Sequence, residues 1–376
     1  MVARILKRHD QLGVLRENGF GGLSSDAQSE INALRNINTN WGDVIYRNAV
    51  NQQYNISVSG VSDFARYYFS GGYYNEEGTT RNTGFERYNI TMKTDFDIIP
   101  NLNVGVSLFV TDSKRNSYLT DADAFINPAN YSRNANPYLK LRDENGDYVY
   151  DQDIEGYSGR YVKFNYLEEM NNTKYTLKNR SIKPMLSLNY KVASWLNLST
   201  QFGMQLEHTS SEKIADKETY YVRKYRERTR VNDGTYFLPD GGIIQNATTD
   251  MNQYQWKLQG EFNKYFAEKH EVNVMAGLEM RGNKTTTIQT KGFGYDPNSL
   301  TTKPLVFPTG STAVDEAAFR QYQKSFAEDR FLSYYMTASY AYDNRYVFFG
   351  SLRYDGSNMF GVDRKYKYLP LWSVSG

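Results

Sequence analysis

The stretch that decides the fold is Asp329–Phe360, which reads DRFLSYYMTASYAYDNRYVFFGSLRYDGSNMF. Two runs flank Asp343-Asn344, and in each run apolar or aromatic side chains occupy every second position. A period of two over ten or more residues indicates an extended strand with one apolar and one polar face. The two-residue Asp343-Asn344 turn predicts that the strands form an antiparallel hairpin. The expected apolar faces carry Leu332, Tyr334, Met336, Ala338, Tyr340 and Tyr342 in the first strand, and Tyr346, Phe348, Gly350, Leu352 and Tyr354 in the second.

The same alternation recurs through most of the chain and predicts about eleven strands. The other predicted strands are Tyr54–Ser59, Ala65–Tyr74, Phe85–Ile98, Leu102–Asp112, Ile182–Val192, Trp195–His208, Tyr254–Tyr265, Glu271–Thr287 and Tyr366–Ser375. Residues 1–50 differ, because Ser24-Ser25-Asp26 can cap a short helix and Asn38–Trp41 then ends that segment. We therefore expect a partly helical segment, 1–50, that leads into a β-region, 51–376.

The predicted connections alternate strictly between short and long. The short ones are Gly60–Phe64, Ile99–Asn101, Ala193–Ser194, Phe266–His270 and Asp343-Asn344, and the long ones are Asn75–Gly84, Ser113–Ser181, Thr209–Asn252, Ile288–Glu328 and Asp355–Lys365. This order places all short turns on one rim and all long loops on the other, as in outer-membrane barrels. The prediction is an all-β, antiparallel transmembrane barrel. The alternative is a large soluble antiparallel sheet with one solvated face.

Composition excludes several function classes. The chain has 33 Tyr and 20 Phe but no stretch near the ~20 apolar residues of a membrane-spanning helix. A net charge of +2 without a basic run gives no support for nucleic-acid binding. Cys is absent, and His9, His208 and His270 stand far apart, without metal-ligand spacing. No catalytic constellation can be recognised, so we expect neither enzyme activity nor a cofactor.

Two sets of residues are candidates for contact with a substrate or partner. Polar residues inside the strands are expected to line a lumen: Gln201, Gln205, Glu207, Lys257, Glu261, Glu279 and Arg281. Aromatic residues of the long loops are expected to stack on a ligand or to contact a capping partner: Tyr131, Tyr138, Tyr157, Tyr236 and Tyr295. The alternative for each loop aromatic is that it packs the loops against themselves.

Two loop motifs have competing interpretations. Asp143–Asp147 (DENGD) suggests a type I′ hairpin at Asn145-Gly146, while a loop-borne Ca²⁺ site remains open because Asp121, Asp123, Asp151, Asp153 and Glu155 lie in the same loop. Cations alternate with other residues over 223–230. A solvated strand extension is the expected structure there, and a phosphate or nucleic-acid site is the alternative.

Three stretches carry a family likeness. They are Asn38–Gly60 (NTNWGDVIYRNAVNQQYNISVSG), Arg66–Gly78 (RYYFSGGYYNEEG), and Arg345–Gly376 with its Arg353-Tyr354-Asp355-Gly356-Ser357 motif. In sequence and order they resemble the SusC/RagA family of TonB-dependent outer-membrane transporters from Bacteroidetes-type bacteria. Asn358, where the family usually has Ser, and Leu371-Trp372, where Pro-Ser is usual, depart from its pattern.

The resemblance implies a barrel of about 22 strands around a plug domain. No plug sequence is recognisable here, so we expect a fragment of about half a barrel, truncated before closure. The whole protein would import bulky nutrients, either glycan oligosaccharides or peptides, across the outer membrane of a Gram-negative bacterium. Its implied partners are a SusD-like surface lipoprotein, the TonB complex through an N-terminal region, and outer-membrane lipid. A passive porin-like or adhesin-type barrel is the alternative.

Overall fold

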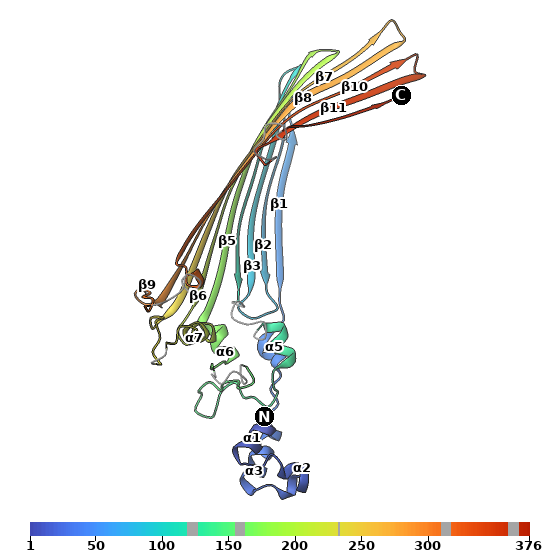
Figure 1. Ribbon diagram of the computed structural model, residues 1–376. Helices are drawn as coiled ribbons and strands as arrows, with labels where there is room; N and C mark the ends of the chain where they lie inside the picture. Colours follow the sequence, from blue (N-terminus) through green and yellow to red (C-terminus); the bar gives the residue numbers. More distant parts are fainter. Residues whose placement is uncertain (119–126, 155–161, 232–233, 310–316, 360–367) are drawn as a thin grey trace.

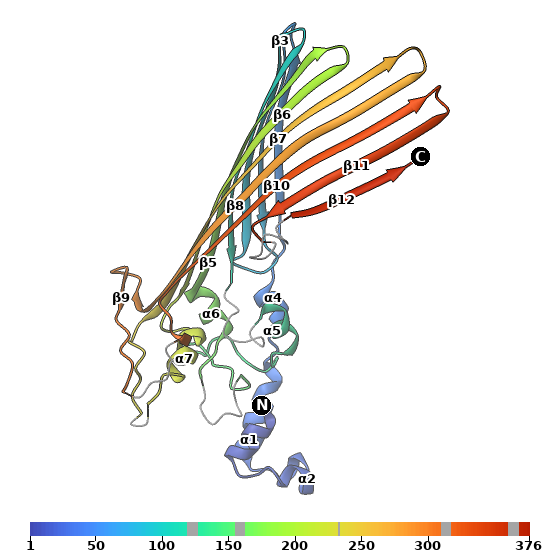
Figure 2. The same ribbon diagram turned by 45° about the horizontal axis from the view of Figure 1, so that its top comes forward.

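The computed structural model describes residues 1–118, 127–154, 162–231, 234–309, 317–359 and 368–376. These residues form a 12-stranded sheet in which each long strand pairs antiparallel with its neighbours in sequence. The strands are β1 Asn51–Val61, β2 Ala65–Glu77, β3 Gly84–Ile99, β4 Leu102–Ser117, β5 Thr173–Ala193, β6 Leu196–Ala215, β7 Gly242–Phe266, β8 His270–Asp296, β10 Tyr322–Tyr342, β11 Tyr346–Ser357 and β12 Tyr368–Ser375. The short β9, Thr301–Lys303, pairs with β8. The sheet is twisted and does not close, so the all-β prediction of an open part of a barrel is confirmed (Figures 1 and 2).

Several strands are much longer than predicted. β7 has 25 residues and β8 has 27, so parts of the predicted loops Thr209–Asn252 and Ile288–Glu328 are strand. In 242–252 and 284–291 the residues are mostly polar or small on both faces. In these extensions the sequence no longer alternates between apolar and polar residues, but the backbone hydrogen bonds between the strands continue. Strand pairing does not require an apolar face. The sequence pattern identified only the two-faced part of each strand.

The short and long connections segregate to opposite ends of the sheet. Helices α5 (Pro128–Asn134), α6 (Tyr166–Asn172) and α7 (Tyr220–Glu227) gather at the end where the long loops lie (Figure 1). The hairpin tips, such as the one between β10 and β11, lie at the other end (Figure 2). The predicted segregation of the connections is thus present in three dimensions.

The turn that closes the β10–β11 hairpin differs from prediction by one residue. Asp343 and Asn344 have φ angles of +51° and +53°, and the Arg345 N–H donates to the Tyr342 carbonyl at 3.0 Å. Both features are typical of a type I′ turn. Strand pairing, however, resumes at Tyr342 opposite Tyr346, so the loop has three residues and not two. The additional residue keeps both apolar runs on the same face; pairing Tyr342 with Arg345 would have put them on opposite faces.

Replacing Asn344 with valine tests this turn. A β-branched side chain is strained at a φ near +53°, so we expect a loss of about 1–2 kcal/mol in the free energy of unfolding. Asn344→Gly should be neutral or slightly stabilising, because glycine adopts this conformation without a steric penalty. Urea unfolding of the complete transporter in lipid measures both variants. Equal stability of the valine and glycine variants would show that the turn is not conformationally demanding.

The first 50 residues contain helices α1 (Val2–Arg8), α2 (Val14–Asn18), α3 (Ser25–Ala33) and α4 (Trp41–Ile45), together with the short turns Phe20–Gly22 and Leu34–Asn36. The Ser24 hydroxyl accepts the Ala27 N–H at 3.3 Å, at the cap expected for α3. The expectation that Asn38–Trp41 ends the helical segment is wrong. The Asn40 side chain accepts the Gly42 N–H and begins α4. Within the described residues, the helices are all too short or too polar to cross a membrane.

Candidate functional site

One face of the sheet is apolar from its first strand to its last. Phe202 of β6 lies opposite Leu186 of β5 and Trp256 of β7, and all three side chains are more than a third exposed. The register continues this row across the sheet. Exposed members include Ile56, Phe69, Met92, Leu186, Phe202, Trp256, Tyr334, Met336, Leu352 and Trp372. An apolar area that extends over so many strands requires a non-aqueous neighbour.

The opposite face carries all seven residues predicted to line a lumen. Gln201 of β6 pairs with Lys257 of β7, which pairs with Glu279 of β8, so three of them lie side by side. The other four follow at two-residue steps along the same strands and so share the face: Gln205, Glu207, Glu261 and Arg281. The alternation in the sequence assigned these faces correctly because no bulge interrupts the central part of β6, β7 or β8.

Hydrogen bonds join these side chains into a polar network that the sequence did not reveal. The Glu279 carboxylate accepts from the Gln255 amide at 3.2 Å and forms an ion pair with Arg281 at 3.3 Å. The Tyr335 hydroxyl donates to the Gln259 side chain at 3.0 Å. Which side chains of neighbouring strands meet on this face depends on the strand register. The alternation of residues within one strand does not specify that register.

The network continues onto the hairpin at β10 and β11. Arg353 contacts Asp355 at 2.8 Å and donates to the Ser333 hydroxyl at 3.1 Å. The Tyr335 ring fits over Gly277, where a Cβ would lie 2.5 Å from the hydroxyl oxygen. The polar face therefore has a fixed arrangement of donors and acceptors of both charge signs.

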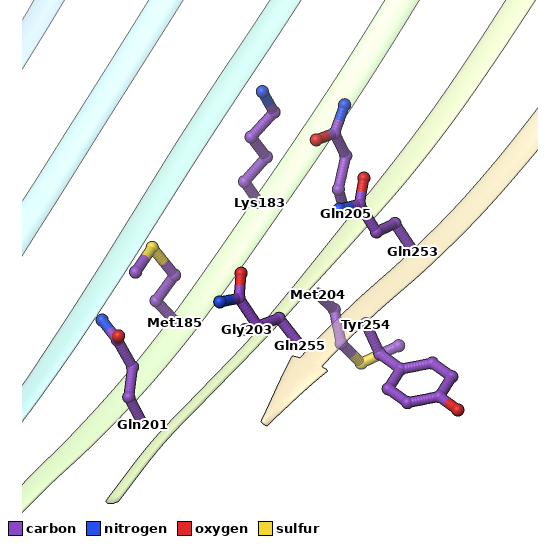
Figure 3. A pocket seen from close by; sticks show the side chains of 9 residues that line it. All are labelled: Lys183, Met185, Gln201, Gly203, Met204, Gln205, Gln253, Tyr254 and Gln255. Atoms are coloured by element: carbon purple, nitrogen blue, oxygen red, sulfur yellow. The ribbon is translucent and has the colours of Figure 1, made fainter. Parts of the chain in front are cut away.

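A shallow depression of about 150 Å³ lies on this face where Gly203 leaves space (Figure 3). On the polar face it is lined by Lys183, Met185, Gln201, Gln205, Gln253 and Gln255, and it is bordered by Met204 and Tyr254, which belong to the apolar face. Four glutamines give it amide donors and acceptors at nearly every side, and a lysine adds one positive charge. Such a surface can bind neutral polar groups by hydrogen bonds without a strong charge preference.

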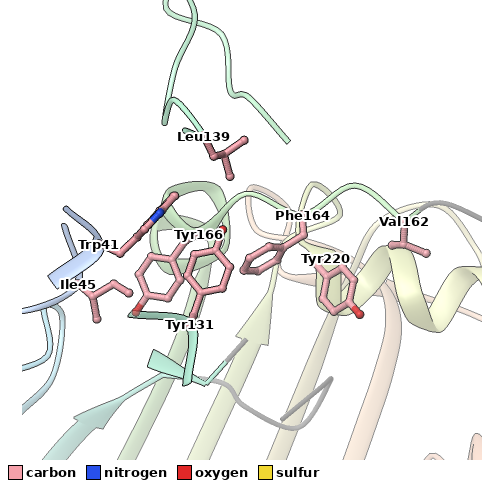
Figure 4. Close-up of a cluster of buried hydrophobic side chains, with 8 residues drawn as sticks. All are labelled: Trp41, Ile45, Tyr131, Leu139, Val162, Phe164, Tyr166 and Tyr220. Carbon is pink, nitrogen blue, oxygen red and sulfur yellow. The ribbon is translucent and has the colours of Figure 1, made fainter. Parts of the chain in front are cut away.

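The long loops pack around an aromatic cluster that contains Tyr131 (Figure 4). The Tyr131 ring is 2% exposed and lies 4.9 Å from the Trp41 ring and 5.2 Å from the Phe164 ring, between centroids. Its hydroxyl donates to the Asp151 carboxylate at 2.9 Å, and burial raises the pKa of both groups. Tyr131 therefore packs the loops against themselves, which is the alternative given above for the loop aromatics.

The remaining loop aromatics have different environments. Tyr295 is 7% exposed and lies in β8, opposite Gly242 of β7, and not in a loop as predicted. The Tyr236 hydroxyl donates to the Glu227 carboxylate at 2.7 Å. Tyr138 is 44% exposed and is free to contact a ligand or a partner. Tyr157 lies outside the described residues.

Two acidic residues of α6 hold α7 in place. The Glu168 carboxylate and the Arg223 guanidinium form a two-pronged ion pair, at 2.8 and 3.2 Å. The Glu169 carboxylate accepts the backbone N–H groups of Tyr220 and Tyr221 at 2.6 and 3.2 Å, and burial raises its pKa to about 7. The predicted strand extension around Arg223 is therefore wrong. Residues 220–222 are buried, and α7 begins at the Thr219 cap.

The Asp143–Asp147 motif closes a small hairpin, in which Arg142 pairs antiparallel with Tyr148, but its turn is not the predicted type I′. Of its residues, only Gly146 has a positive φ, whereas a type I′ turn requires two. The Asp143 carboxylate instead accepts the N–H groups of Asn145 and Asp147, both at 2.9 Å. Within the described part of the chain, no group of three carboxylate or imidazole side chains is arranged to hold a metal. Asp121, Asp123 and Glu155 fall outside that part.

Comparison with known proteins gives consistent results. No protein-family profile matches the sequence. TonB-dependent receptor P3 of Formosa agariphila is 22% identical over 360 residues, which cover 90% of this chain and 31% of the receptor. TonB-dependent receptor P39 of the same organism is 24% identical over 343 residues, 89% of this chain and 29% of the receptor. The chain thus spans about a third of the length of these curated relatives.

Solved structures share the fold. The RagAB peptide transporter superposes with a TM-score of 0.68 at 17% identity, covering 99% of this chain and 41% of the compared chain. The RagAB peptide importer in its open-open state gives a TM-score of 0.66 at 19% identity, covering 90% of this chain and 34% of the other.

Proposed function

Because the chain is a segment of a SusC/RagA-type TonB-dependent transporter of the outer membrane, we propose that the complete protein imports a bulky polar nutrient, either a glycan oligosaccharide or a peptide. The observation that carries this proposal is the contrast between the two faces of the sheet. The apolar face meets lipid, and the polar face lines the path of the nutrient.

The dimensions of the apolar face support this orientation. In β5 the apolar side chains occupy alternate positions from Ile182 to Val192. That span corresponds to the roughly 9–11 residues with which a tilted strand crosses a bilayer. The remaining half of the strand, toward Thr173, extends beyond this band on the side of the long loops. The band is thus about as tall as a membrane, and the long loops project from one side of it.

The polar network suits a neutral or zwitterionic cargo rather than a small ion. Gln201, Gln205, Glu207, Lys257, Glu261, Glu279 and Arg281 are the proposed lumen-lining residues. They combine amides with both signs of charge, and Glu279 and Arg281 neutralise each other. Hydrogen-bonding groups with little net charge match the hydroxyls of sugars and the amides of peptides equally well. The proposed substrates are therefore oligosaccharides or peptides.

We propose a different partner for each of the two rims of the barrel. The long-loop rim would contact a SusD-like lipoprotein, with the exposed Tyr138 and the rim residue Tyr236 as candidate contacts. Tyr131 and Tyr295 would act indirectly, because their buried rings set the shape of the loops. The TonB complex would act from the short-turn side, through a region outside the barrel strands.

Uptake by cells with and without a proton gradient tests the proposal against a passive channel. Cells that carry the complete transporter are given fluorescent oligosaccharides or peptides, with a strain that lacks the transporter as the control. We expect uptake of one substrate class to depend on the transporter and to stop when a protonophore is added. Transporter-dependent uptake that survives the protonophore would favour the porin-like alternative, and none at all would favour an adhesin.

A further inference from the structure

The apolar face changes its chemistry abruptly on the side of the long loops. Beyond Val110 of β4 and Ile182 of β5, the next residues on this face are Asp112 and Arg180, which form an ion pair at 2.7 Å. Beyond Leu206 of β6, His208 contacts Asp250 of β7 at 2.6 Å. A row of charged pairs therefore borders the apolar band, at the level where a membrane surface would lie.

Two lysines face each other one step beyond this border. Lys114 of β4 and Lys178 of β5 are directly opposed in the register and lie on the same face as Asp112 and Arg180. Opposed like charges destabilise a sheet, unless an anion lies between them. Lys174, four residues along β5, adds a third ammonium group on this face. All three lysine side chains are exposed, and within the described residues none of their ammonium groups forms an ion pair or a hydrogen bond.

The lysines line a depression of about 370 Å³. Its other lining residues are Thr176, Ser210, Ser211, Glu212, Asn246, Ala247 and Thr248. Hydroxyl and amide groups beside the ammonium groups can donate hydrogen bonds to a phosphate. Glu212, and Glu86 opposite Lys114, are the carboxylates nearest in the register, and neither forms an ion pair with the three lysines. The three ammonium groups outnumber these two carboxylates, so the site has a net charge of +1 and can attract an anion.

We propose that Lys114, Lys174 and Lys178 form a binding site for the phosphate-bearing headgroup of a lipid in the outer leaflet. The inference rests on the proposed orientation of the apolar face toward lipid. Lys114 and Lys178 each lie four residues beyond the last apolar position of their strand, about 13 Å along the strand and about 9 Å in height at a 45° tilt. This height corresponds to the headgroup layer.

The position of the site favours a lipid over a free anion or a macromolecule. The depression and the apolar band are parts of the same strands on the same face, β4, β5 and β6, so a bound lipid can place its acyl chains against Ile182 and Leu206 while its phosphate contacts the lysines. A free phosphate would gain only the second of these contacts. The face also points away from the lumen, so the site is separate from the proposed path of the nutrient.

The test compares lipid retention by variants of the complete transporter. The double variant Lys114→Gln/Lys178→Gln and the wild type are reconstituted in phosphatidylcholine bilayers that contain a minor fraction of phosphatidic acid. The lipid that remains bound is then counted by native mass spectrometry. We expect the double variant to retain phosphatidic acid about 30-fold more weakly, given the attraction of each lysine to an anionic headgroup. Unchanged retention would overturn the proposal.

The matched control is Lys183→Gln, which removes a charge from the same strand on the opposite face. An equal loss in this variant would overturn the proposal, because the effect would then be one of overall charge. Competition with inorganic phosphate distinguishes the two sources of the anion. Retention that persists in excess phosphate supports the lipid site, and complete displacement would show a site for free anions only.

A separate measurement distinguishes failure of this inference from failure of the proposed function. Nitroxide labels are placed at Phe202→Cys and Gln201→Cys, and their access to oxygen and to a water-soluble relaxant is compared. If the Phe202 label meets lipid while the lysine variants retain phosphatidic acid normally, the headgroup site alone is wrong. If the Phe202 label does not meet lipid, the orientation of the barrel is wrong, and the headgroup site is overturned with it.

Discussion

Replacing Arg223 with alanine should weaken the docking of α7 on α6 by about 3–5 kcal/mol, because it leaves the buried Glu168 carboxylate without its partner. The Glu168 side chain is only 6% exposed, so water cannot solvate its carboxylate in place of the lost guanidinium. The local loss should appear as faster exchange of the amide protons in α7. Hydrogen exchange of the complete transporter, followed by mass spectrometry of peptides that cover 166–172 and 220–227, measures it.

A control on the same helix separates burial from charge. Arg226 pairs with Asp240 at 2.8 Å, but both side chains are about half exposed. Arg226→Ala should therefore cost less than about 1 kcal/mol. The double variant Glu168→Gln/Arg223→Ala should recover part of the stability, because no uncompensated charge stays buried. If Arg223→Ala and Arg226→Ala accelerate exchange to the same extent, the ion pair with Glu168 does not hold α7.

Replacing Phe202 with arginine is the second change with a large expected effect. Phe202 lies in the middle of the apolar band, opposite Leu186 and Trp256. A cation facing the centre of the bilayer destabilises a barrel by about 2–4 kcal/mol. We expect this loss in the free energy of unfolding of the complete transporter, measured with urea in lipid vesicles.

Gln201→Arg is the matched control, because Gln201 is adjacent in sequence but faces the other side of the sheet. There the arginine would enter the polar network beside Lys257, so a smaller effect is expected. The difference between the two variants reports which face meets lipid. An equal cost at both positions would contradict the assignment of the apolar face to the membrane.

Much of the fold follows from local alternation. The Asp329–Phe360 hairpin, the faces of β4 to β8 and the separation of the two rims could all be predicted, because a strand with unlike faces repeats its chemistry every two residues. The strand ends could not. In β7 and β8 the polar extensions have similar residues on both faces, so the period of two gives no signal there.

The candidate site could be predicted only in part. The seven polar residues share the predicted face, but their partners Gln255, Gln259 and Tyr335 emerged only from the register. The positions of the loop aromatics could not be predicted either. Tyr131 is buried against Trp41, 90 residues earlier in the chain, and no local pattern indicates such a contact. Likewise, α7 forms where a strand was predicted, because two carboxylates of α6 bind its first turn.

The sequence by itself thus determined which residues face the same way along each strand, because backbone geometry dictates that alternation. The Asp343-Asn344 turn shows where this local information ends. Its residues indicate a two-residue hairpin turn, but in the tertiary structure Arg345 also belongs to the loop. This third residue places the apolar side chains of β10 and β11 on the same face. Tertiary structure alone decided which side chains meet across strands and loops. Those contacts depend on register and on packing between distant segments, and neither is encoded in a local period.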